Sequence, residues 1–217
     1  GQPPGRRPEQ PAPALPPAVS PPSAATRLPA RSGLVVNSLS TSRARTAYRF
    51  IGNDVTFAHT DHLRQQLAAY LQGLGLARGD RVAIMMPNVP QYPVAVAAIL
   101  RAGFVVVNVN PLYTPRELEH QLKDSGSKAI VIIENFAGTL EKCLGATPVK
   151  HIVLCTMGDM LGGVKSALVN YVVRNVKKLV PAFSLPGSVN FTEALAPGST
   201  GSRTGPAANP REHALLT

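Results

Sequence analysis

The chain has 217 residues and a formal net charge of +10; 44% of its residues are hydrophobic, only 5% are aromatic, and tryptophan is absent. This length suffices for one domain with a sizeable core, and the composition excludes collagen-like, coiled-coil and mucin-like chains. The longest apolar run, residues 92–109, is interrupted by a proline, an arginine and an asparagine, so no membrane-spanning helix is predicted. Cys143 and Cys155 are the two cysteines, and their spacing supports neither a disulfide scaffold nor a zinc site.

The N-terminal segment, residues 1–46, is rich in proline and arginine. Residues 1–31 hold 10 of the 21 prolines, and seven arginines precede residue 50 against a single acid, Glu9. Such a segment cannot donate regular backbone hydrogen bonds or bury enough side chain to offset the entropy cost of ordering, so we expect a disordered arm. A basic arm could bind RNA, but this one has no aromatic side chains for base stacking, and no nucleic-acid partner is predicted.

The arm also has the composition that GC-rich DNA often yields when it is read in a wrong frame. We therefore hypothesise that residues 1–46 are a frameshift product or an artefact. Detection of peptides from this range by mass spectrometry of native cells would contradict the hypothesis.

From residue 56 onward, helical and strand patterns alternate. Short apolar runs predict buried strands over 81–86, 104–107, 129–133 and 151–154. Helical spacing of apolar residues predicts helices over about 58–73, 92–101 and 136–144. Strands joined by helices of this length imply an α/β fold with a mostly parallel sheet flanked by helices.

The clearest helix start is Thr114-Pro115-Arg116-Glu117. Threonine at the N-cap, proline at the first helical position and glutamate at the third form the pattern in which both side chains satisfy free backbone amides. Leu118 and Leu122 of this helix are expected to face the core.

The residues alone predict no catalytic, cofactor-binding or metal-binding site. The glycines of 73–79 have the wrong spacing for a dinucleotide-binding turn and follow a helix rather than a strand, and no phosphate-binding loop or nucleophile motif is present. His59 and His62 share a helix face near Asp61 and could hold a metal, but two surface histidines at this spacing are more often ordinary.

Residues 164–183 are predicted to form a basic amphipathic helix without any acid. Its apolar stripe is Leu168, Val172, Val176, Leu179 and Phe183, and its basic residues are Lys165, Arg174, Lys177 and Lys178. Such a helix can lie on an anionic membrane surface, with these four basic residues as the contacts. It can equally pack its stripe on the sheet, which is the commoner arrangement for amphipathic helices.

Two blocks, residues 79–92 (GDRVAIMMPNVPQY) and 99–122 (ILRAGFVVVNVNPLYTPRELEHQL), resemble the N-terminal region of bacterial long-chain fatty acyl-CoA synthetases, which are AMP-forming adenylating ligases. The likeness runs from about residue 48 to 196 and includes the basic segment that ends in KKLVPAFSLPG at 177–187. The resemblance implies that residues 47–195 form part of the N-terminal, AMP-binding domain of such a ligase.

The resemblance also implies a reaction. In this family a fatty acid carboxylate attacks the α-phosphate of ATP, with Mg²⁺ neutralising phosphate charge, and the CoA thiol then displaces AMP. The family's phosphate loop, ribose-binding Asp and C-terminal Lys have no match here; residues 200–205 look superficially similar but are interpreted as part of a linker, 196–217.

These observations predict a piece of a long-chain fatty acid–CoA ligase that stops before the nucleotide-binding half. By itself it should lack turnover and bind ATP, Mg²⁺ and CoA poorly. We expect a cytoplasmic location, either free or peripheral on the inner face of the cell membrane. The alternative is a non-catalytic membrane-surface or interaction module that uses residues 164–183. Chain-length preference and oligomeric state have no signal in the sequence.

Overall fold

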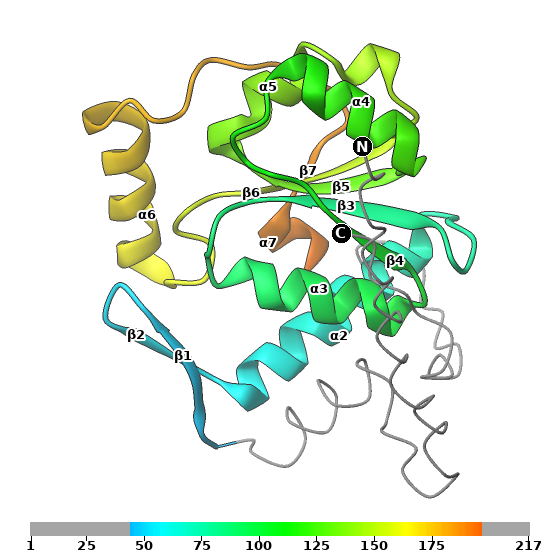
Figure 1. The fold of residues 1–217 in the computed structure, drawn as a ribbon. Helices are drawn as coiled ribbons and strands as arrows, with labels where there is room; N and C mark the ends of the chain where they lie inside the picture. Colours follow the sequence, from blue (N-terminus) through cyan, green and yellow to red (C-terminus); the bar gives the residue numbers. More distant parts are fainter. Residues whose placement is uncertain (1–43, 197–217) are drawn as a thin grey trace, which may run out of the picture.

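A computed structural model describes residues 44–196. They form a five-stranded parallel sheet between two layers of helices, with a separate two-stranded hairpin beside it (Figure 1). Nearly all of the predicted arm, 1–46, and of the predicted linker, 196–217, lies outside the described residues, as does the 200–205 segment.

The sheet confirms the predicted α/β class. Its strand order is β4 (Val105–Asn108), β3 (Arg81–Met85), β5 (Ala129–Ile133), β6 (His151–Cys155) and β7 (Val189–Asn190). All neighbouring strands are parallel. Four strands coincide with predicted apolar runs to within one residue. The fifth, β7, has only two residues, which is too short for an alternation pattern to reveal it.

Helices cover both faces of this sheet. Helices α2 (Phe57–Gly73), α3 (Gln91–Ala102) and α7 (Phe191–Ala194) lie on one face, and α4 (Pro115–Ser125) and α5 (Ala137–Glu141) lie on the other (Figure 1). Successive strand residues contribute to opposite cores: Ile130 and Ile132 pack toward α4, while Val131 and Ile133 pack toward α3. Burial of both faces explains why the strands read as continuous apolar runs.

The hairpin was not predicted. Strands β1 (Thr46–Phe50) and β2 (Asn53–Thr56) are antiparallel and lead directly into α2. The hydroxyl of Tyr48 donates to the Pro90 carbonyl at 3.2 Å, and Asn53 Nδ2 donates to the Met160 carbonyl at 3.3 Å. These two bonds attach the hairpin to loops that leave the sheet.

Two predicted helices are shorter than expected. The helix over 136–144 is replaced by a 3₁₀ turn η1 (Glu134–Phe136), the single-turn α5, and a second 3₁₀ turn η2 (Leu144–Ala146). Glycines at 138 and 145 weaken a continuous helix here.

The predicted helix over 164–183 was wrong in extent. Helix α6 covers Gly163–Tyr171 and a π turn η3 covers Val172–Val176. Lys178 then has φ of 50° and Pro181 follows, and a right-handed helix accommodates neither a left-handed residue nor an internal proline. Within residues 44–196 no helix is long and apolar enough to cross a membrane.

The predicted start of α4 is confirmed in its atomic detail. The hydroxyl of Thr114 accepts from the Glu117 amide, and the Glu117 carboxylate accepts from the Thr114 amide at 2.8 Å. Leu118 and Leu122 are fully buried. The bond from the Thr114 amide, with help from its hydroxyl, lowers the pKa of Glu117.

We expect Thr114→Ala to lower the free energy of unfolding by about 1 kcal/mol, because one helix-end amide loses its partner. Thr114→Ser keeps the hydroxyl and should have little effect, and urea denaturation at pH 7 compares the two. Since the folded pKa of Glu117 is lowered, its contribution is present above the unfolded value of about 4.3 and is lost as pH falls through the folded pKa. Thr114→Ala removes the hydroxyl that donates to Glu117 Oε2 at 2.8 Å, so this part of its deficit should disappear in acid, and an unchanged deficit would contradict this account.

Both cysteines are free and buried, as their positions in apolar segments predicted. Burial, with a smaller effect from Glu119, raises the pKa of Cys143 to about 11. Burial also raises the pKa of Cys155, which is fully enclosed.

We therefore expect neither thiol of Cys143 or Cys155 to react with Ellman's reagent in the native protein at pH 8, because the thiolate is the nucleophile and both sulfurs are shielded. Both should react once guanidinium unfolds the chain. Rapid labelling of either thiol without unfolding would contradict the burial of that side chain.

Candidate functional site

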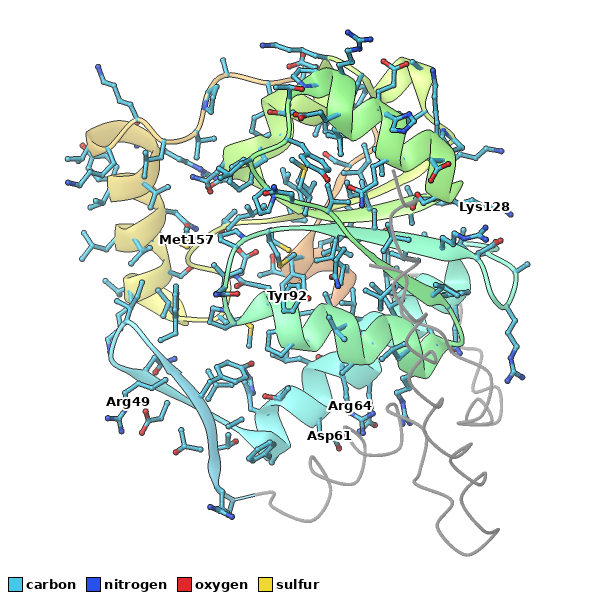
Figure 2. The ribbon with its side chains drawn as sticks, viewed as in Figure 1. Arg49, Asp61, Arg64, Tyr92, Lys128 and Met157 are labelled. Carbon is cyan, nitrogen blue, oxygen red and sulfur yellow. The ribbon has the colours of Figure 1, made fainter. Side chains whose placement is uncertain are left out.

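The loops at the carboxyl ends of the strands form the candidate site. In a parallel sheet these ends lie on one edge, and ligands of α/β proteins bind there. Helix α6 and the hairpin stand at this edge, while Lys128, at the amino end of β5, lies on the opposite side of the molecule (Figures 1 and 2). Met157 is seen between the edge and α6 in Figure 2.

A hydrogen-bonded turn after β6 holds α6 in place. The Thr156 amide donates to Asp159 Oδ2 at 2.7 Å, and Thr156 Oγ1 also bonds to the Asp159 carboxylate. Asn170 of α6 bonds this turn twice, through Nδ2 to Thr156 Oγ1 at 2.9 Å and through Oδ1 from the Gly158 amide at 2.8 Å. Burial, opposed by the Thr156 bonds and assisted by Glu134, raises the pKa of Asp159.

An ion pair fixes the π turn η3 to the end of β5. Arg174 Nε and Nη2 both donate to Glu134 Oε2, at 2.9 and 2.6 Å. The Glu134 side chain is only 2% exposed and the Arg174 side chain is 48% exposed. The hydrogen bonds to Glu134 raise the pKa of Arg174, although burial opposes them. Arg174, predicted as a membrane contact, therefore has its guanidinium engaged with a protein carboxylate.

Several buried polar atoms at this edge have no partner among the described contacts. They include Glu134 Oε1, Asn135 Oδ1 and Gln91 Oε1, and Gln91 Nε2 donates to the Thr156 carbonyl at 2.8 Å. Nearby, the Tyr92 hydroxyl at the start of α3 donates to Asn108 Oδ1 at 2.9 Å (Figure 2). Sequence reasoning singled out none of these polar groups, because only the sheet brings the ends of β3, β4, β5 and β6 together.

The other predicted surface residues, Lys165, Lys177 and Lys178, are exposed, and none forms an ion pair with the described part of the chain. Most of the predicted apolar stripe does not pack on the sheet, because no residue of α6 is buried; Phe183, its last residue, is half-buried against the core on the α4 side. Leu168, the first residue of that stripe, is 60% exposed. Helix α6 instead contacts the rest of the fold through the side that carries its half-buried residues, among them Asn170.

The histidine pair has no metal-binding geometry. The Asp61 carboxylate accepts from Arg64 Nε at 2.6 Å and from Gln65 Nε2 at 2.9 Å, so neighbours on α2 occupy both of its oxygens. Across residues 44–196, no group of three or more histidine, cysteine, aspartate or glutamate side chains could hold a metal ion.

Comparisons with known proteins give the family. The model of the AMP-binding enzyme family matches residues 37–193. The long-chain-fatty-acid–CoA ligase of Escherichia coli O157:H7 is 57% identical over 153 residues, and that of Haemophilus influenzae is 56% identical over 155 residues. The matches cover 70% and 71% of this chain but only 27% and 28% of the relatives. The resemblance read from the sequence is confirmed, and the chain spans about a quarter of the length of these relatives.

Solved structures give the same fold at low identity. The anthranilate CoA ligase AuaEII aligns with a TM-score of 0.60 and 18% identity, over 76% of this chain and 27% of that protein. A long-chain-fatty-acid CoA ligase from Rhodopseudomonas palustris CGA009 aligns with a TM-score of 0.59 and 18% identity, over 82% of this chain and 39% of that protein. These likenesses concern the architecture alone.

Proposed function

Because this chain belongs to the family of AMP-binding enzymes, we propose that it forms the N-terminal part of a long-chain fatty acid–CoA ligase. The whole enzyme joins a fatty acid to CoA and converts ATP to AMP and pyrophosphate. The observation that carries this proposal is the 57% identity over 153 residues to a ligase of that name. The match covers 70% of this chain, and the family model matches residues 37–193, which include nearly all of the described fold.

The cofactors of the whole enzyme are ATP, Mg²⁺ and CoA. Residues 44–196 contain neither a glycine-rich phosphate loop nor a cluster of metal ligands, so these residues do not fit a nucleotide–magnesium site. We assign no ligand of these groups to this chain. Its role in the enzyme is to provide the parallel sheet and the edge against which the remaining domains are built.

We also propose a cytoplasmic location, peripheral on the inner face of the membrane. Two free cysteines that are buried apart from each other are compatible with a reducing compartment. A long-chain fatty acid dissolves in the bilayer, so an enzyme that uses it gains from working at the membrane surface.

A chimera tests the ligase proposal. Residues 44–196 of this chain would replace the matching segment of the E. coli O157:H7 ligase. Purified chimera is expected to form acyl-CoA from palmitate, ATP and CoA at a rate within about tenfold of the parent, because packing across the domain should tolerate the substitutions. A folded but inactive chimera would overturn the proposal.

The 217-residue chain provides the second arm of this test. We expect it to form no acyl-AMP or acyl-CoA from the same substrates, since the described residues hold no nucleotide site. Turnover by the isolated chain would show that the catalytic groups had been assigned to the wrong part of the enzyme.

A further inference from the structure

Residues 164–177, which we call the α6–η3 segment, add nothing to the two apolar cores of the described fold. Figure 1 shows α6 at the end of the sheet, outside both helical layers, and no residue of α6 or η3 is buried. Its half-buried valines, Val169, Val172 and Val173, belong to neither of the clusters that pack on the faces of the sheet. Apolar burial therefore contributes little to holding this segment in place.

Two polar side chains attach the segment instead. Asn170 bonds to Thr156 and to the Gly158 amide, and Arg174 donates twice to Glu134. Among the described residues, no other side chain of the segment bonds to a residue outside it. The attachment also has a cost, because it leaves Glu134 Oε1 buried without a partner, and contact with water would remove that cost.

Residues with left-handed backbone conformations lie at both ends of the segment. Gly162 and Gly163 have φ of 74° and 41°, and Lys178 has φ of 50°. Right-handed helical geometry is interrupted at these residues. Hinges in proteins are typically a few residues at the ends of elements, where a change of φ and ψ can be absorbed. The segment therefore has a hinge position on either side.

The chain is fixed again just outside each hinge position. The Met160 carbonyl accepts from Asn53 Nδ2 at 3.3 Å, and the Leu179 carbonyl accepts from Asn135 Nδ2 at 3.1 Å. The Met160 side chain is also buried in the core on the α3 side. The segment can therefore move between these two points without disturbing the sheet.

The charge of Arg174 acts on both attachments. Burial raises the pKa of Asp159, and the nearby Arg174 charge opposes that rise. The Asp159 carboxylate in turn bonds to the Thr156 hydroxyl, which accepts from Asn170 Nδ2 at 2.9 Å. Arg174 thus pairs with Glu134 directly and supports the Asn170 contact through Asp159. Because the groups form one network, losing either attachment weakens the other.

We propose that the α6–η3 segment is a hinged lid that docks on the carboxyl edge of the sheet through Asn170 and Arg174 and releases as one unit. Release exposes the Glu134 carboxylate and the turn 156–159 at the edge where ligands of α/β proteins bind. This inference rests on the inward contacts of the segment, and neither on its exposed apolar side nor on the ligase reaction, so its failure leaves the chimera result untouched.

Hydrogen exchange of the 217-residue chain tests the proposal. A helix this short is marginal in water by itself, so its amides exchange whenever the segment releases. We expect amides of 166–177 to exchange at least about 100-fold faster than those of β5 and β6. Their exchange should also depend less steeply on urea, because release exposes less surface than global unfolding. Equal protection and equal urea dependence of the two sets would overturn the proposal.

Two substitutions test whether the segment releases as one unit. Asn170→Ala removes two hydrogen bonds, each worth about fivefold in an equilibrium constant, and should accelerate exchange of 166–177 by at least about tenfold. Arg174→Met should accelerate the same amides by at least as much, because docking then leaves a buried carboxylate unpaired. Each substitution should act on the whole range, including the turn that carries the other residue. Acceleration confined to the turn around the changed residue would overturn the proposal.

The segment itself offers matched controls, Asn175→Ala and Lys177→Met. Asn175 Nδ2 donates to the Tyr171 carbonyl inside the segment, and Lys177 is exposed and forms no ion pair with the described residues. These controls repeat the loss of an amide or of a positive charge without touching the sheet, so exchange of 166–177 should stay within about threefold of the parent. If they accelerate exchange as much as Asn170→Ala and Arg174→Met do, the effect reflects helix stability alone and the lid proposal fails.

Discussion

Arg174→Met should lower the free energy of unfolding by about 2–3 kcal/mol, because it leaves the nearly buried Glu134 carboxylate without its partner. Removing one member of a buried ion pair costs about 3–5 kcal/mol, and the half-exposed guanidinium places this pair somewhat below that range. Glu134 Oε1 already has no partner, so no other described contact replaces the lost bonds. Urea denaturation monitored by far-UV circular dichroism measures the loss.

Two controls identify the cause of that loss. Arg49→Met removes an ion pair to Asp54 in which the two side chains are 73% and 44% exposed, and it should leave stability unchanged because exposed pairs contribute little. Combining Arg174→Met with Glu134→Leu removes both charges and should recover most of the stability, because the buried charge is gone. If the double variant is no more stable than Arg174→Met, the loss comes from packing of the arginine side chain rather than from an unpaired carboxylate.

Gly158→Ala should detach or displace α6. A Cβ atom at this position would lie 2.6 Å from the Ser166 carbonyl oxygen and 2.8 Å from Asn170 Oδ1, closer than such contacts occur. Asn170 would then have to give up its bond to the Gly158 amide and its bond to Thr156. Forcing an extra carbon into a packed contact costs about 1–3 kcal/mol, and each hydrogen bond lost adds about 1 kcal/mol.

Hydrogen exchange distinguishes the two responses to this change. If α6 and η3 detach while the rest of the fold stays intact, amides of 166–177 should exchange faster and those of β5 and β6 should stay protected. The free energy of unfolding should then fall only by the energy with which α6 and η3 pack on the rest of the molecule. Gly145→Ala is the matched control, because its new Cβ would meet nothing within 4 Å, and stability should change by less than about 0.5 kcal/mol. A Gly158→Ala protein with parental stability and parental exchange would show that α6 does not pack against this turn.

The positions of the main helices and strands could be predicted from the sequence because apolar runs and capping residues act locally. The run Ala129–Ile133 is apolar at every position and is buried at every position, as a central parallel strand requires. Thr114 and Glu117 lie three residues apart, and their capping bonds depend on nothing beyond that turn. Such features are determined by residues that are close neighbours in the sequence.

Helix α6 and the turn η3 show where prediction from local patterns failed. The apolar residues of the predicted stripe recur at helical spacing, and spacing alone favoured packing on the sheet, yet the structure leaves Leu168, Val176 and Leu179 exposed. Periodicity reports that a helix has an apolar side, but the surface that covers that side is formed by other segments or by another molecule. The half-buried side of α6 instead faces a turn held by Thr156 and Asp159, and those bonds carry no sequence signature.

The α/β class, the parallel strands and the start of α4 follow from local patterns, because hydrophobic spacing and capping act over a few neighbouring residues. Motif similarity added the ligase family. The ion pair between Glu134 and Arg174, which are 40 residues apart, and the position of the hairpin tip beside α6 could not be predicted from local patterns. Those contacts depend on the order and direction of the strands, which bring distant loops to one edge of the sheet.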